Sequence, residues 1–452
     1  MSSLEVSYDI EHQDDVTAEQ LADEERKNFL LILAAFRLYK TTSMNSVIKR
    51  EKYLNSLSKK HQSLLEKYRE TLNRIRDAIH ANYQVIKVMI KTIDQLFLND
   101  NESTYCDNNS ELCKVGLNEI ERVQVTLKQI ARDWSTDGED ERQQCYKPII
   151  DEVVNYFPPE STDVANIKIL VPGAGLGRLM YELSYIGYFC EGNEFSLFML
   201  IASNFILNRC LVENEYKLYP YVHQYVNNLN RGDQTRAITF PDVSPTQRPP
   251  KQGTMNMVAG DFLEIYKDAD YWDCVATCFF IDCANNVVDF IETIFNILKP
   301  NGVWINLGPL LYHYSDVIGE LSIEPTFEDI CNIMTEIGFV IEKCTTGVRT
   351  LYSQNPKSMQ KSEYESVFFV CRKPAFCCPL IKIGPTHPTF RADTTCDTIS
   401  CVIWSSSNIN FPVQLKMIEK NLHFVLIDWV WVVSWKILML RFPQNPICHP
   451  EN

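Results

Sequence analysis

Residues 167–194 read IKILVPGAGLGRLMYELSYIGYFCEGNE, and the rest of the 452-residue chain is arranged around this stretch. An apolar run stops at Pro172 and continues into a glycine-rich turn over residues 173–177. Apolar residues at helical spacing follow, and then a second apolar patch that ends at Glu194. A buried strand, a glycine turn, a helix and an acid after the next strand are the parts of a nucleotide-binding βαβ unit.

The residue types in this stretch indicate how a nucleotide would bind. Gly173 and Gly175 let the backbone approach a ligand closely, and the start of the following helix offers unpaired N–H groups. Glu194 lies 21 residues after Gly173, where an acid accepts hydrogen bonds from ribose hydroxyls. The combination favours a nucleotide site over an ordinary tight turn between a strand and a helix.

The composition narrows the class of protein. Apolar residues at 45% and charged residues at 22% are typical of a soluble globular protein. The net charge of −15 argues against a general nucleic-acid or membrane binder, which needs a basic surface, and suits a small cationic or zwitterionic ligand. The 16 cysteines form no C-x-x-C pair, so we expect reduced thiols in the cytoplasm or nucleus and no metal site.

The N-terminal third is predicted to be helical. Residues 1–20 are acidic and polar and are expected to be disordered, and residues 21–160 form a helical region. Within it, residues 18–97 predict a long amphipathic helix or a hairpin, with breaks near 41–46 and 59–62. This element either packs against the main domain, which we favour, or mediates a homodimer.

Two further helices, residues 118–134 and 139–156, come just before the glycine turn. Gln129 and Arg132 on the first of them could reach over the ligand. Spacing alone fits equally well with solvent-facing positions for both side chains.

Residues 161–375 alternate between strand and helix patterns, which predicts a doubly wound, mostly parallel α/β sheet. Residues 211–254 interrupt the alternation and are expected to form a lid or a subunit contact. The expected elements are helices at 195–210, 287–298 and 327–338, strands at 255–259, 272–280 and 303–307, and a closing antiparallel pair at 340–344 and 366–371.

Polar and aromatic residues gather where the predicted strands end, which is where ligands of open α/β sheets bind. Asp261 is placed to accept from an adenine amino group, or is a helix N-cap, and Phe262 could stack on the base. Asp282 ends a buried strand, where an acid without a role is costly, and could hold a cationic or N–H-bearing substrate. His313 either serves as a substrate ligand or acid/base, or is structural.

The C-terminal segment 376–452 follows no α/β pattern. Its residues 422–440 have nearly the length of a membrane span, but Asp428 and Lys436 within it are expensive in lipid. We therefore expect an atypical, aggregation-prone tail rather than a membrane anchor.

Six segments carry a family resemblance: ILVPGAGLGRL, GNEFS, SNFILNRC, GDFLEIY, WDCVATCFFID and WINLGPLLYH. Together they closely resemble the carnosine N-methyltransferase family over about residues 20–375. The resemblance implies a seven-stranded, Rossmann-like methyltransferase sheet with a helical N-terminal region, and S-adenosylmethionine as the cofactor. It implies cofactor contacts from Gln129, Arg132, Gly173, Gly175, Glu194, Asp261, Phe262 and Cys278, and contacts to a dipeptide substrate from Asp282, His313 and Tyr364.

The implied reaction is methylation of the imidazole of carnosine to give anserine, with Asp282 and His313 as the catalytic residues. The alternatives are methylation of histidine in a larger peptide or protein, an NAD-dependent dehydrogenase, and a non-catalytic helical scaffold with a degenerate nucleotide site. The dehydrogenase is disfavoured by the absence of a catalytic Lys/Tyr pair at short spacing and by the Asp261-Phe262 site. The tail from about Phe376 departs from the family pattern, and no role is carried onto it.

Overall fold

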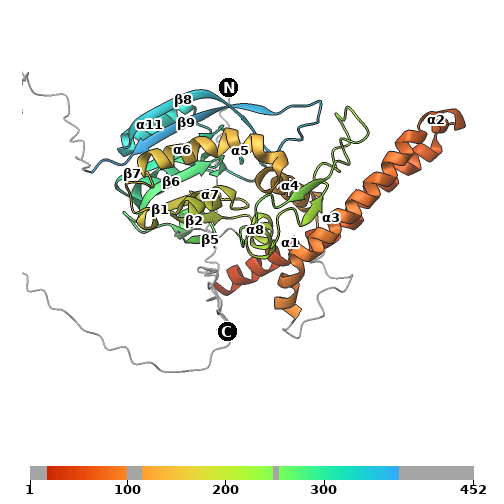
Figure 1. The fold of residues 1–452 in the computed structure, drawn as a ribbon, viewed down its shortest axis with the longest axis horizontal. Coiled ribbons are helices and arrows are strands. Elements are labelled where there is room, and N and C mark those ends of the chain that lie inside the picture. Colours follow the sequence, from red (N-terminus) through yellow and green to blue (C-terminus); the bar gives the residue numbers. More distant parts are fainter. Residues whose placement is uncertain (1–17, 99–114, 248–253, 376–452) are drawn as a thin grey trace, which may run out of the picture. The chain divides into compact units, whose positions relative to one another are not determined.

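The computed structural model describes residues 18–98, 115–247 and 254–375. Nine strands are assigned within these residues, and seven of them form the central sheet (Figure 1). The strands of the central sheet are β1 Lys168–Pro172, β2 Phe189–Glu194, β5 Met255–Ala259, β6 Trp272–Cys278, β7 Leu298–Gly308, β8 Val340–Leu351 and β9 Glu363–Arg372.

The strand order across the sheet is β5-β2-β1-β6-β7-β9-β8. The first five strands run parallel to their neighbours, and β9 runs antiparallel to both β7 and β8. The order reverses between β1 and β6, which creates a crevice at the carboxyl ends of these strands. The predicted doubly wound sheet and its closing antiparallel pair are both confirmed.

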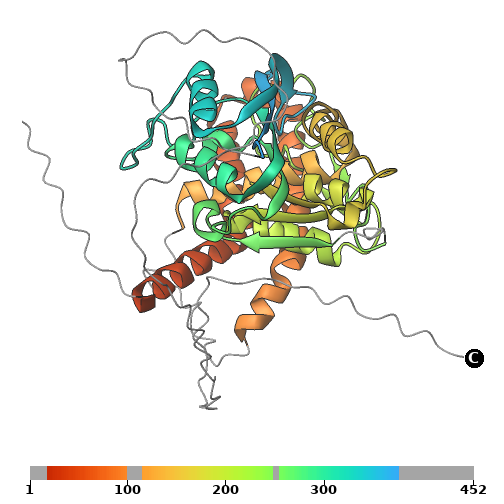
Figure 2. The ribbon, with the colours of Figure 1, turned by 90° about the vertical axis from the view of Figure 1, so that its left-hand side faces the viewer.

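Helices cover both faces of the sheet because successive strand residues point to opposite sides. Ile169 and Val171 of β1 belong to one apolar core, whereas Leu170 between them belongs to the other. In Figure 2 the teal α11 and the yellow α6 lie on opposite sides of the strands. The first layer contains α6 Lys147–Tyr156, α7 Arg178–Ile186 and α8 Leu197–Arg209, and the second contains α9 Phe262–Ile265, α10 Val287–Ile297 and α11 Phe327–Ile337.

The N-terminal region forms the predicted hairpin. Helices α1 Ala18–Ser56 and α3 Glu66–Leu98 run side by side, with the short α2 Lys59–Leu64 at the tip (Figure 1). The break predicted near residues 41–46 is wrong, because α1 continues through them. Ser43 and Val47 are buried there, and this packing outweighs the weak helix propensity of the segment.

Two shorter helices and one turn follow the hairpin: α4 Leu117–Trp134, η2 Thr136–Gly138 and α5 Glu139–Cys145. The single helix predicted over residues 139–156 is divided into α5 and α6 around Tyr146. Pro148 at the start of α6 lacks a backbone N–H, so it suits a helix start and would break a continuous helix.

The insertion at residues 211–254 contains a two-stranded antiparallel sheet that the sequence did not predict, β3 Tyr216–Leu218 with β4 Ile238–Phe240. It is bound to the helical hairpin. Asn82 of α3 donates to the carbonyl of Tyr219 at 3.0 Å and accepts from its N–H at 2.8 Å. The insertion therefore joins the hairpin to the α/β domain, and its predicted role as a lid or subunit contact stays a prediction.

Short 3-10 turns precede β1 and follow β6: η3 Val164–Asn166 and η4 Ile281–Cys283. None of the helices in the described ranges has the length and apolar character needed to cross a membrane. The predictions for residues 1–17, for the polar loop near 99–109 and for the tail 376–452 fall outside the described residues.

Candidate active site

The glycine turn after β1 has the backbone that a close ligand contact requires. Gly173, Gly175 and Gly177 adopt φ angles of 65°, 56° and 80°, a region that disfavours residues with a side chain. A Cβ on Gly173 would lie 2.6 Å from the ring of Phe280, so this position is closed to larger residues. A Cβ on Gly175 would meet no atom within 4 Å, so the turn has open space above it.

Glu194 lies at the end of β2, next to this turn. Its Oε2 accepts from the N–H of Gly175 at 2.8 Å, and its Oε1 accepts from the N–H of Ser196 at 2.8 Å. Burial raises the pKa of Glu194, while the two N–H groups lower it in part. Each carboxylate oxygen can accept a second hydrogen bond, so the side chain remains able to bind ribose hydroxyls.

The ends of β1, β2 and β5 are bonded to one another at this edge. Ala174 donates to the carbonyl of Asn193 at 2.9 Å, and Gly260 donates to the carbonyl of Glu194 at 3.1 Å. The buried amide of Asn193 donates to the carbonyl of Gly260 at 2.9 Å. These bonds fix the relative positions of the glycine turn, Glu194 and the segment that carries Asp261.

Asp261 and Phe262 differ in how they face the site. Asp261 is the N-cap of α9, because its Oδ1 accepts from the N–H of Leu263 at 2.7 Å. The N-cap role that the sequence offered is therefore confirmed for this oxygen. The ring of Phe262 is 3% exposed and packs edge-on against Phe280 and Phe290. The ring belongs to the apolar core, and its stacking on a base stays a prediction.

Helix α4 ends beside the glycine turn. The indole N–H of Trp134 donates to the carbonyl of Leu176 at 3.0 Å, which bonds the end of α4 to the turn. Gln129, one helical turn earlier, is buried, and its amide donates to the hydroxyl of Tyr352 at 2.7 Å. The solvent-facing alternative for Gln129 and Arg132 is therefore wrong, since both side chains are buried.

Arg132 is held by charged and aromatic neighbours. Its guanidinium donates to Asp133 at 2.9 Å and to the hydroxyl of Tyr146 at 2.6 Å, and its Nε lies 3.5 Å from Glu141. The centre of the guanidinium is 4.9 Å from the ring centroid of Tyr352, in cation–π range. This arrangement fixes a permanent positive charge near the end of α4.

The last carbonyls of α4 are bound by side chains of other elements. Arg142 donates to the carbonyls of Arg132 and Ser135, both at 2.7 Å, and Arg178 donates to the carbonyl of Asp133 at 2.9 Å. Asp242 of the insertion accepts from Arg142 at 2.7 Å and from Arg178 at 2.6 Å. We call Arg142, Arg178 and Asp242 the arginine clamp; it anchors the helix that carries Gln129 and Arg132.

Asp282 lies in η4, just beyond β6, and is 1% exposed. Its Oδ2 accepts from the N–H of Leu311 at 2.8 Å, whereas its Oδ1 is buried and has no hydrogen-bond partner among the described residues. Burial raises the pKa of Asp282, and the Leu311 N–H and His313 lower it in part. The N–H of His313 donates to the Asp282 carbonyl at 3.0 Å, which brings this exposed imidazole to the carboxylate.

Aromatic residues line the approach to Asp282. Phe279 has a φ of 54°, a strained backbone for a bulky residue, and strain of this kind gathers at functional sites. Its ring centroid lies 4.8 Å from that of Tyr352 and 6.1 Å from that of Tyr364. Tyr364, from the antiparallel strand β9, therefore lies beside Phe279, which precedes Asp282 by three residues in the chain.

The comparison with protein families follows this geometry. A family profile described as carnosine N-methyltransferase matches residues 109–375. The chain belongs to the carnosine N-methyltransferase family. The chain is similar to carnosine N-methyltransferases from an insect, a mammal and a yeast. A carnosine N-methyltransferase of Drosophila melanogaster is 52% identical over 369 residues, which cover 78% of this chain and 81% of the relative.

Two further relatives of the carnosine N-methyltransferase family extend the match. The mouse carnosine N-methyltransferase is 46% identical and covers 79% of this chain and 89% of the relative. The enzyme of that name from Schizosaccharomyces pombe is 38% identical and covers 77% of this chain and 96% of the relative. The family match covers residues 109–375, and residues 376–452 lie outside it, so the predicted departure of the tail from the family stays a prediction.

In this member of the carnosine N-methyltransferase family, most of the predicted site residues lie at one edge of the sheet. Cys278 is less directly placed, because its thiol points toward the carbonyl of Cys145 at 3.9 Å and burial raises its pKa strongly. Sequence reasoning missed Tyr352 and Asp242, which stand in segments without a motif. Phe279 was within reach, because it lies inside the quoted segment WDCVATCFFID.

Proposed function

We propose that the protein methylates the imidazole of carnosine with S-adenosylmethionine as the methyl donor, giving anserine. The relatives that match over most of their length carry the name carnosine N-methyltransferase. The observation that carries the proposal is the buried Oδ1 of Asp282, which has no hydrogen-bond partner among the described residues. Asp282 follows Phe280 by two residues, and the Phe280 ring packs on Gly173 of the glycine turn. It is an acceptor for an N–H donor placed next to a nucleotide site.

The residues at the glycine turn fit S-adenosylmethionine. The space above Gly175 has room for a ligand, and the second lone pairs of Glu194 accept ribose hydroxyls. Asp261 has one oxygen left for an adenine amino group, since its other oxygen caps α9. When bound, S-adenosylmethionine supplies a methyl group activated by its positive sulfonium.

The substrate imidazole must present a neutral nitrogen as the nucleophile, while its other nitrogen carries the proton. Oδ1 of Asp282 accepts this N–H, which fixes the tautomer before the reaction. Once the first nitrogen has gained its substituent the ring is cationic, and the Asp282 carboxylate stabilises that charge in a site of low dielectric. The ring becomes neutral again when this proton leaves toward Asp282.

The remaining residues position the dipeptide and exclude water. His313 is bonded to the backbone of Asp282, and the ring of Tyr364 lies against that of Phe279, three residues before Asp282 in the chain. Aligning the reacting atoms is the main task of an enzyme for direct methyl transfer, because the reaction needs no further activation of the donor. His313 and Tyr364 orient the ring and the peptide group in this proposal.

The test is a methyl-transfer assay with the full chain, labelled S-adenosylmethionine, carnosine and a set of histidine-containing peptides. We expect labelled carnosine, and NMR of the product identifies the methylated nitrogen. Label on the longer peptides with none on carnosine would favour the peptide or protein alternative. Binding of S-adenosylhomocysteine without label on any substrate would favour the non-catalytic scaffold.

A further inference from the structure

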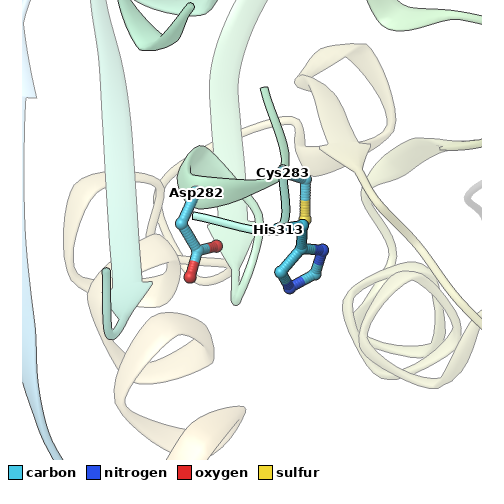
Figure 3. Close-up of side chains that lie close together, drawn as sticks. All are labelled: Asp282, Cys283 and His313. Carbon is cyan, nitrogen blue, oxygen red and sulfur yellow. The ribbon is translucent and has the colours of Figure 1, made fainter. Parts of the chain in front are cut away.

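We propose that Asp282, Cys283 and His313 form a binding site for Zn²⁺, and that zinc bound there blocks the substrate side of the active site. Figure 3 shows the three side chains leaving neighbouring backbone segments and pointing into the same space. One donor atom from each residue lies within 4.8 Å of the other two. The site is a built cluster of three different metal ligands that the sequence, with no spacing typical of zinc, did not predict.

The donor set points to zinc among the divalent cations. A thiolate, an imidazole and a carboxylate are the ligands that Zn²⁺ prefers, whereas Mg²⁺ and Ca²⁺ prefer oxygen alone. Tetrahedral zinc, with ligands at about 2.0–2.3 Å, separates its donor atoms by roughly 3.5 Å. The three donors therefore need only rotamer adjustments to reach that geometry. Three protein ligands leave the fourth position for water.

A second observation points to a missing ligand at this place. Asp282 is 1% exposed, and its Oδ1 is buried with no hydrogen-bond partner. A buried oxygen without a partner is costly, and such a group in a native structure is explained by an ion, a water or a substrate that completes it. Among the residues that the structure describes, the hydrogen bond of the Cys283 thiol is a long one of 3.8 Å to the carbonyl of Phe279.

The backbone holds the three ligands in place. Asp282 and Cys283 are consecutive residues of η4. The Asp282 carboxylate accepts from the N–H of Leu311 at 2.8 Å, and the Asp282 carbonyl accepts from the N–H of His313 at 3.0 Å. Two bonds thus join the segment after β7 to η4, and they bring His313 to the cluster before any metal binds. A preformed site loses less entropy on binding than a flexible one.

Zinc at this site excludes the substrate, and this part of the inference rests on the proposed function. The Oδ1 of Asp282 and the imidazole of His313 would be occupied by the metal, so neither could hold the substrate ring. Binding converts the Cys283 thiol to a zinc-bound thiolate and releases one proton to the solvent, with no change in oxidation state. The inhibition is therefore reversible by a chelator.

The direct test is a titration of the full chain with CoCl₂, which replaces zinc and has visible absorption. We expect the bands of a tetrahedral Co²⁺ site with a thiolate-to-metal charge-transfer band. C283S should remove the charge-transfer band, and H313Q, which changes an exposed side chain, should weaken Co²⁺ binding at least about tenfold. C344S, which changes an exposed thiol elsewhere, and the double variant C377S/C378S should leave the spectrum unchanged.

The second test is the methyl-transfer assay at a series of free Zn²⁺ concentrations set by a metal buffer, because the substrate imidazole also binds zinc. Wild type should lose activity at micromolar free Zn²⁺ and regain it with EDTA, and C283S should keep its activity in zinc. A spectrum that is identical in wild type, C283S and H313Q overturns the site. Equal zinc inhibition of wild type and C283S overturns the blockade. The cobalt titration uses no substrate, so its result does not depend on whether carnosine is the methyl acceptor.

Discussion

The two halves of the active site differ in how completely their polar groups are paired before any ligand binds. On the cofactor side, both oxygens of Glu194 accept backbone N–H groups, and Arg132 is surrounded by acids and aromatic rings. On the substrate side, Oδ1 of Asp282 is buried without a partner. The Nε of Arg132 is the comparable orphan on the cofactor side, but it lies 3.5 Å from a Glu141 oxygen.

The difference shows where each half obtains its binding energy. A ligand on the cofactor side adds second hydrogen bonds to groups that are already fixed, so the site is preorganised and little is gained from any one atom. A ligand on the substrate side relieves an unpaired buried oxygen, which costs about 1–3 kcal/mol when left alone. We therefore expect a substitution of Asp282 to reduce catalysis strongly. On the cofactor side, we expect each single substitution to have a smaller effect.

The largest effect is expected from D282N. The amide keeps the size of the side chain but loses the charge that holds the substrate N–H and stabilises the imidazolium. We expect kcat/KM for carnosine to fall by roughly 10²- to 10⁴-fold. Calorimetry should give an unchanged affinity for S-adenosylhomocysteine. Full turnover by D282N would show that the unpaired oxygen has no part in the reaction.

The arginine clamp tests the fixed side through stability. Asp242 has 11% side-chain exposure and pairs with both Arg142 and Arg178, so its removal takes away the acid paired with Arg142 and leaves Arg178 with Glu182. We expect D242A to lower the free energy of unfolding by about 3–5 kcal/mol, measured with urea. The exposed Asp268 provides the control, since D268A should stay within about 0.5 kcal/mol of wild type. Equal stability of the two variants would contradict the role of the clamp.

Most of the fold could be predicted from the sequence. In the site, residues at strand ends could be predicted, but several of the residues that contact them could not. Glu194 and Asp282 could be found because each is an acid at the end of an apolar strand, where an unpaired charge is costly. Tyr352 and Asp242 could not, because they stand in a strand end and an insertion whose positions depend on tertiary packing. The sequence also left Gln129 undecided, since helical spacing does not show that Tyr352, more than 200 residues later, contacts its side chain.

Glu194 gives the next effect, seen in the pH dependence of cofactor binding. Burial raises its pKa, and hydroxyl donors favour the ionised form, so the affinity is present above the raised pKa and lost as pH falls through it. We expect the affinity of wild type for S-adenosylhomocysteine to fall as the pH is lowered through the raised pKa of Glu194. E194Q should bind roughly 10- to 100-fold more weakly at neutral pH, with a flatter profile. A profile of E194Q parallel to that of wild type would assign the titration to another group.

The smallest effect is expected from Y352F. This change removes the 2.7 Å bond from Gln129 but keeps the ring beside Arg132. A neutral hydrogen bond contributes about 0.5–1.5 kcal/mol, so the KM for S-adenosylmethionine should rise by roughly 2- to 10-fold with kcat little changed. Y271F removes the hydroxyl of an exposed tyrosine that precedes β6, at the opposite end of that strand from Cys278, and should leave both constants unchanged. A fall in kcat alone would place Tyr352 on the substrate side instead.

The position of β9 has a consequence for the synthesis of the protein. It is the last described strand to leave the ribosome, yet it lies inside the sheet, between β7 and β8. A chain that stops before Glu363 would leave the long, buried strand β7 with an unpaired edge, and such edges template aggregation. The same truncated chain would lack Tyr364. Premature termination in this region should therefore yield insoluble protein rather than a weakened enzyme.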